Sequence, residues 1–196
     1  DQAREMHVGV LQMNELFTTK MMKRLNLSQR QVLKYMQNAS SEKVVVGKFR
    51  HADDRIREIE MSRAELIHLV GQLQNESVRE RSMHKKGDAY TEEIIEALKL
   101  ALSENDNRAV LVMTEFYNEY YPRINKAYSA AEGINLVKEE DYFPTSREGD
   151  PEDISFLGQV LFGGNVSSGA LKSRTGSVKP LKRRNGFGTL MSHINE

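Results

Sequence analysis

A proline stands in the middle of a stretch with helical periodicity, and it limits how this chain can fold. From Val110 to Tyr128 the apolar residues return every three or four positions, which predicts one long helix. Pro122 lies inside this stripe, where a helix loses a backbone donor and clashes with the carbonyl four residues back, at a cost of about 3 kcal/mol. The stripe keeps its phase on both sides. We therefore predict one kinked helix, or two helices meeting at Tyr121, held by packing that outweighs the proline penalty.

Tyrosines accompany this proline, and they favour packing over ligand binding. A buried tyrosine contributes a large flat area and still offers its hydroxyl to a polar partner. An aromatic stripe at helical spacing is usually core rather than a stacking surface for a ligand. A glycine is well placed as the left-handed stop of the helix, and a second proline holds the residue before it extended. The residues predicted to be structural here are Tyr117, Tyr121, Pro122, Tyr128, Gly133, Tyr142 and Pro144.

Helix starts are marked along the rest of the chain by capping residues. Apolar spacing predicts a helix over residues 3–24. Capping boxes, in which a serine and a glutamine or glutamate three residues later satisfy each other's backbone donors, begin at Ser28 and Ser62. A further helix is predicted to begin at Thr91, where two glutamates face the positive end of the helix dipole. In contrast, residues 40–54 break the helical period, and we interpret them as a loop with some strand character.

Beyond the long helix the pattern becomes irregular. Asp150 and Pro151 form a cap followed by proline at the first helical position, which predicts a helix over residues 152–162. A Gly/Ser-rich connection, a mostly irregular basic segment and a last short helix over residues 187–193 are then expected. The chain begins at Asp1 and ends in mid-pattern, so we expect it to be a piece of a longer protein.

The fold class predicted from these patterns is all-α. We expect an irregular multi-helix bundle of six to eight helices around the Pro-kinked, Tyr-rich helix, with a short extended segment and a basic C-terminal arm. The predicted organisation is an N-terminal helical segment (1–60), a core helical domain (61–148), and a spacer helix, linker and basic arm (149–196).

Charge is balanced over the whole chain but unevenly distributed. Lysine plus arginine and aspartate plus glutamate both number 28, so net charge alone points to neither nucleic acid nor a membrane surface. Residues 154–195 contain six basic residues and no acid, which leaves the remainder acidic. Cysteine is absent, so disulfides and thiolate metal ligands are excluded. No apolar run approaches the roughly 18 residues of a membrane-spanning helix.

The sequence predicts no catalytic residue, no metal site and no cofactor, and we expect the protein not to be an enzyme. It lacks a phosphate loop, a His-Glu-x-x-His helix and a nucleophile elbow. His51 with Asp53 and Asp54 offers three metal ligands on a turn, but a solvated cap before a helix is the favoured interpretation. Three adjacent acids at residues 139–141 are interpreted as a solvated face.

The basic arm is the clearest sign of a function beyond packing. Its side chains can neutralise several phosphates, which predicts DNA or RNA contact that weakens steeply with salt. Interleaved aromatic residues are nearly missing, so base stacking is not indicated. The same charges can instead be solvated or pair with the acidic body. The candidate nucleic-acid-binding residues are Lys172, Arg174, Lys179, Lys182, Arg183 and Arg184.

Several stretches, taken in order, resemble a helical region of the very large polyvalent proteins of tailed bacteriophages and prophages. They are "MSRAELIHLVGQLQNES", "GDAYTEEIIEAL", "MTEFYNEYYPRINKAYSAAEGINLVKEEDYFPTSRE" and "SGALKSRTGSVKPLKRRNGFGTLMSHI". The resemblance covers residues 61–194 and rests on the shared order of these motifs. Two features depart from the pattern: Glu132 stands where an aromatic residue is common, and the spacer at residues 148–169 looks particular to this chain.

The resemblance implies a setting rather than a reaction. Such polypeptides are packaged in the virion and ejected with the genome, like internal virion proteins and virion RNA polymerases. It implies a non-catalytic structural or interaction domain in a DNA-delivery conduit, located in the capsid interior or tail lumen and then in the host envelope, periplasm or cytoplasm. The implied partners are further copies of the chain and other ejection, tail or portal proteins, with DNA as a candidate through the basic arm. The alternatives are a nucleic-acid-binding accessory domain of a giant virion polypeptide and, third, an enzyme with an unrecognised site.

Overall fold

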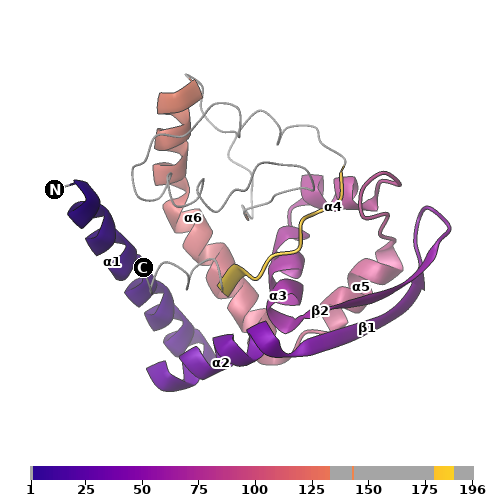
Figure 1. Cartoon of the computed structure of the whole chain (residues 1–196), viewed down its shortest axis with the longest axis horizontal. Coiled ribbons are helices and arrows are strands. Elements are labelled where there is room, and N and C mark those ends of the chain that lie inside the picture. The colour runs from indigo at the N-terminus through magenta and orange to yellow at the C-terminus, as the bar shows by residue number, and fades with distance from the viewer. Residues whose placement is uncertain (1, 133–142, 144–178, 188–196) are drawn as a thin grey trace.

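The computed structural model describes residues 2–132, 143 and 179–187, and this part of the chain folds as helices around one buried helix with a β-hairpin at the side (Figure 1). The elements, in chain order, are α1 (Gln2–Leu25), α2 (Gln29–Ser41), β1 (Lys43–Arg50), β2 (Ile56–Ser62), α3 (Arg63–Gln72), α4 (Glu76–Met83), α5 (Glu92–Leu100) and α6 (Glu104–Glu132).

The β-hairpin corrects the all-α prediction. Strands β1 and β2 pair antiparallel, with Val45 opposite Glu60 and Lys48 opposite Glu58, and a bulge falls between Val45 and Gly47. The strand character expected at residues 40–54 is therefore real, but its partner β2 was not predicted. The period-two signal is present in β2, where the buried Ile59 alternates with charged neighbours. The fold is thus mostly helical with a small two-stranded sheet.

The predicted helix starts are confirmed at the atomic level. Ser28 caps α2 and Ser62 caps α3, and both capping boxes are complete, with the side chain at the third helical position returning to the cap backbone. Thr91 caps α5 through the backbone N–H of Ile94. These contacts are local in sequence, which is why the residues alone identified them.

Helix α6 continues through the proline that the sequence singled out. It runs unbroken over Glu104–Glu132 with Pro122 inside it. Pro122 is exposed, and so is Asn118, whose carbonyl loses the N–H that proline lacks. Water can hydrate that carbonyl, so the penalty is smaller than at a buried position. A single helix is therefore the outcome, while the kink itself stays a prediction.

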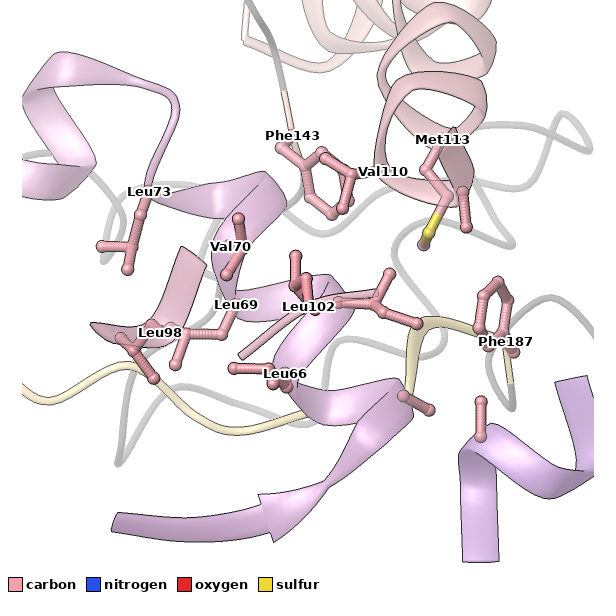
Figure 2. Close-up of a cluster of buried hydrophobic side chains, with 14 of the residues drawn as sticks. Leu66, Leu69, Val70, Leu73, Leu98, Leu102, Val110, Met113, Phe143 and Phe187 are labelled. Atoms are coloured by element: carbon pink, nitrogen blue, oxygen red, sulfur yellow. The ribbon is translucent and has the colours of Figure 1, made fainter. Parts of the chain in front are cut away.

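Helix α3 lies at the centre of the molecule and is covered from every side. All residues from Leu66 to Gln72 are buried. Helices α2, α5 and α6 and both strands contact it. Figure 2 shows its leucines and valine facing side chains from α5 and α6, with Phe143 and Phe187 arriving from separate segments. The buried cluster also includes Phe17 of α1, so all three predicted segments contribute to one core. Their boundaries stay a prediction.

A buried polar cluster ties three helices together beside this core. The Tyr35 hydroxyl of α2 donates to Asp106 Oδ1 of α6 at 2.6 Å. Arg63, at the start of α3, lies 3.6 Å from the same oxygen through Nε and places its guanidinium 5.4 Å from the Tyr35 ring centroid. Asp106 is 1% exposed and also accepts from Ser103 N–H. Burial and the hydrogen bond to Asp106 raise the pKa of Tyr35 above its usual range.

Replacing the central carboxylate tests whether this cluster holds the helices together. We expect Asp106→Ala to lower the free energy of unfolding by about 3 kcal/mol, because it leaves the Tyr35 hydroxyl without its acceptor and removes the carboxylate that Arg63 Nε faces at 3.6 Å. Urea denaturation followed by circular dichroism measures the loss. Glu104→Gln, an exposed change in the same helical turn, is the control and should stay within about 0.5 kcal/mol of the parent. Equal losses for both variants would contradict a role for the buried cluster.

Candidate functional site

The most distinctive site is formed where the basic arm returns to the body. We call residues 179–187 the docked arm. In Figure 1 the arm, drawn in yellow, runs from beside α4 toward the middle of the molecule and ends next to α6. Leu181 N–H donates to Asp88 Oδ2 at 3.1 Å, Arg183 Nη1 donates to the Glu60 carbonyl of β2 at 2.7 Å, and Asn185 Nδ2 donates to Ser40 Oγ of α2 at 2.7 Å. The arm therefore spans three elements that are remote from it in sequence.

Two apolar side chains anchor the docked arm. Leu181 is 4% exposed and Phe187 is 1% exposed, and both belong to the main core cluster. The Phe187 ring meets Tyr35 edge-on, with 6.0 Å between ring centroids. Burying two such side chains contributes about 1.5–3 kcal/mol each. The anchors, rather than the charges, therefore supply most of the docking energy.

Close approach of the backbone at Gly186 makes the fit of the docked arm specific. A Cβ atom at this position would lie 2.6 Å from Met113 Cε and 2.7 Å from His68 Nδ1. The Met113 end can move, but the His68 ring is packed in α3 and cannot give way easily. Only glycine lets the arm backbone lie against α3 and α6 at this point.

His68 lies under the arm and is the most perturbed titratable group of the site. Its ring is 5% exposed, approaches Gln72 Nε2 at 3.2 Å through Nε2 and meets the Phe143 ring edge-on at 5.0 Å. His68 Nδ1 has no hydrogen-bond partner among the described residues. Burial, and secondarily the positive charge of Arg184, lower the pKa of His68 to about 3. The imidazole is therefore neutral in the folded protein at any moderate pH.

The structure places four of the six candidate nucleic-acid-binding residues in the docked arm. Lys179 and Arg183 are exposed, and Lys182 and Arg184 are half-buried. Arg183 also hydrogen-bonds to Tyr90, whose pKa is raised to about 12 by burial and by Asp88, an effect that Arg183 opposes. These cations are thus partly engaged with the body. The other two candidates, Lys172 and Arg174, lie outside the described residues.

Only some of the residues predicted to be structural lie in the described part of the chain. Tyr117 is 3% exposed, and its ring lies 5.0 Å from that of Phe143, which fills the space beside Gly71. The side chains of Tyr121 and Tyr128 are not among those described, and Gly133, Tyr142 and Pro144 lie outside the described residues.

The turn that offered metal ligands has another role. His51, Asp53 and Asp54 form the connection between β1 and β2, so the predicted cap before a helix is wrong. Asp53 accepts from Arg55 N–H and pairs with the Arg57 guanidinium, and His51 Nδ1 faces the Asp88 carbonyl at 3.1 Å. Within the described part of the chain, no group of three potential ligand side chains is positioned to hold a metal ion.

Sequence reasoning did not identify the anchors Leu181 and Phe187 or the buried His68 as parts of one site. The only signal available was two apolar residues six positions apart within a run of cations and polar residues. That signal is too weak to predict docking, because the contact surface under the arm is formed by the loop before α5, β2, α2, α3 and α6 together. We call this surface the groove.

Comparisons with known proteins add no relative. No protein-family model matches the sequence, and neither a curated protein nor a solved structure matches the chain. Of the helices in the described residues, none has the length and apolarity that crossing a membrane requires.

A methyl group at the close approach tests the docked geometry. We expect Gly186→Ala to lower the free energy of unfolding by about 1–3 kcal/mol, since overpacking forces the arm away from His68. Limited proteolysis with proteinase K should then cleave the arm faster than in the parent. Arg30→Ala is the control, because Arg30 is an exposed residue of α2 outside the arm. Unchanged stability and cleavage in Gly186→Ala would show that the arm does not lie against α3.

Acidification tests the buried imidazole. Because the pKa of His68 is lowered on folding, its stabilising contribution is complete above about pH 6.5 and is lost as pH falls toward 3. In that window stability should fall by up to about 1.4 kcal/mol per pH unit through this residue alone. We expect His68→Gln to flatten the pH dependence measured by urea denaturation. His84→Gln, at an exposed histidine, should leave the slope as in the parent; an equal slope in His68→Gln would refute the assignment.

Proposed function

We propose that this chain is a non-catalytic structural and interaction domain of a phage virion protein that is ejected with the genome and contributes to the DNA-delivery conduit. The setting rests on the resemblance of residues 61–194 to the helical region of polyvalent phage proteins. The interaction role rests on one observation, which is that the body holds a nine-residue peptide segment from far along the chain in a specific groove.

Peptide docking of this kind is how interaction domains work. Recognition uses two buried apolar anchors, a close backbone approach at Gly186 and hydrogen bonds to side chains and a backbone carbonyl. All of these contacts are non-covalent, and none of them uses a catalytic group. In this proposal the groove and the arm serve assembly with copies of the chain and with other ejection, tail or portal proteins.

Short capped helices suit passage through a narrow tail. Four of the six helices in the described part of the chain carry 8–13 residues, and isolated helices of such length are marginal without tertiary packing. Pulling the chain through a tail would therefore unfold these helices once their packing contacts are lost. After passage, the capping boxes would fix the residues at which the capped helices begin again. The proposed location is the virion interior or tail lumen before ejection and the host envelope, periplasm or cytoplasm afterwards.

The second candidate is a nucleic-acid-binding accessory domain. It is favoured by Lys179 and Arg183, which remain exposed on the docked arm. Phosphate contact by these and neighbouring cations would be sequence-independent and strongly dependent on salt.

Assembly without DNA separates the two functions. We expect the purified chain to form rings, tubes or smaller defined oligomers in concentrated solution free of nucleic acid, as seen by electron microscopy and sedimentation. The variant with Lys182, Arg183 and Arg184 all changed to Ser is compared on a DNA column. Retention of the parent that falls steeply with salt and disappears in this variant, together with a monomeric parent, would favour the accessory role and overturn the conduit role.

A further inference from the structure

We propose that the groove holding residues 179–187 also accepts the same residues from a second copy of the chain, so that copies join by exchanging docked arms. The inference rests on the assembly between copies proposed above and names how two copies join. Failure of the exchange test below would leave the virion setting and its separate assembly test standing.

The arm of either copy can make the contacts seen in the docked arm. The docked arm makes hydrogen bonds to residues remote from it in sequence, among them Asp88, Glu60 and Ser40. The arm of a second copy carries the same groups in the same order. Exchange therefore forms the same contacts again, with each groove filled and no apolar anchor left in water.

The shape of the groove selects this occupant over an unrelated peptide. An incoming segment needs an apolar residue and an aromatic residue six positions apart, matching Leu181 and Phe187, and it needs glycine just before the aromatic, because a Cβ at position 186 would meet His68. It also needs a donor that reaches Ser40 from position 185. A second copy meets all of these requirements without any adaptation of the groove.

Concentration decides between self-docking and exchange. Self-docking is intramolecular and does not depend on protein concentration, whereas exchange is bimolecular and rises with it. Intramolecular docking through a tether corresponds to an effective concentration on the order of 1 mM. Self-docking should therefore dominate in dilute solution, and exchange should compete once copies are crowded to a similar concentration.

The absence of cysteine from the chain allows a direct test with all 196 residues present. One copy carries Ser40→Cys and the other carries Asn185→Cys, at two side chains that touch across the groove at 2.7 Å. The two proteins are mixed over a range of concentrations and joined by oxidation or a short bis-maleimide, and linked dimers are counted on a denaturing gel. We expect the linked fraction at near-millimolar concentration to exceed that at hundredfold dilution by about tenfold or more.

Three controls make each outcome decisive. A single chain carrying both cysteines should close on itself at every dilution; failure to close means that the arm is not docked, and this overturns the proposal. Phe187→Ala in the Asn185→Cys copy removes the aromatic anchor and should lower the linked fraction about tenfold. Leu100→Cys, at an exposed residue of α5 (85% exposed), replaces Ser40→Cys to report random collision. A linked fraction equal to this collision control, or no linked dimer at any concentration, would also overturn arm exchange.

Discussion

Burial of residues 66–72 of α3 on every side is the constraint on which the rest of this structure depends. Residues 66–72 are all buried, and seven consecutive residues turn almost twice around a helix, so this part of α3 has no face left for water. A helix of ten residues is marginal by itself and needs packing to persist. Helices α2, α5 and α6 and the hairpin cover most of it. Phe143 and the docked arm cover what remains, so the core is complete only when late segments of the chain have returned.

The part of α3 beside Gly186 and Phe143 contains a buried polar side chain, His68. His68 and Gln72 are buried in contact with each other, and His68 Nδ1 has no hydrogen-bond partner among the described residues. Such a group costs about 1–3 kcal/mol compared with a satisfied one. The arm thus covers a surface that is less favourable to bury than leucine or valine would be, and its specificity comes from the tight approach at Gly186. Docking of this kind is selective without being very strong, which suits a segment that can change partners.

Features encoded by neighbouring residues were predictable, and features encoded across the chain were not. The caps at Ser28 and Ser62 follow from groups within a few positions of each other, whereas the apolar stripe of α6 left open one kinked helix or two helices meeting at Tyr121. Strand β2 was missed because its buried Ile59 and Met61 stand among charges that resemble a loop. Helix α4 was missed because it has almost no apolar stripe.

The candidate site shows the same limit more clearly. Six cations dominate the composition of the basic arm, so charge defined the prediction. The groove, however, is made by the loop before α5, β2, α2, α3 and α6 together, and only its three-dimensional form reveals that Leu181 and Phe187 fit it. Both anchors are ordinary apolar residues, and the residues next to them in the sequence do not predict which elements they contact.

The cations of the docked arm cannot serve the body and a phosphate backbone equally at the same time. Arg183 donates to the Glu60 carbonyl, and Arg184 is half-buried close enough to His68 to lower the pKa of that imidazole. Turning either side chain fully to a phosphate would weaken the contacts that hold the arm between its anchors. Phosphate binding is screened by salt, whereas the burial of Leu181 and Phe187 is not. The two uses of the arm therefore compete, and rising ionic strength shifts the balance toward docking on a body, whether its own or that of a neighbouring copy.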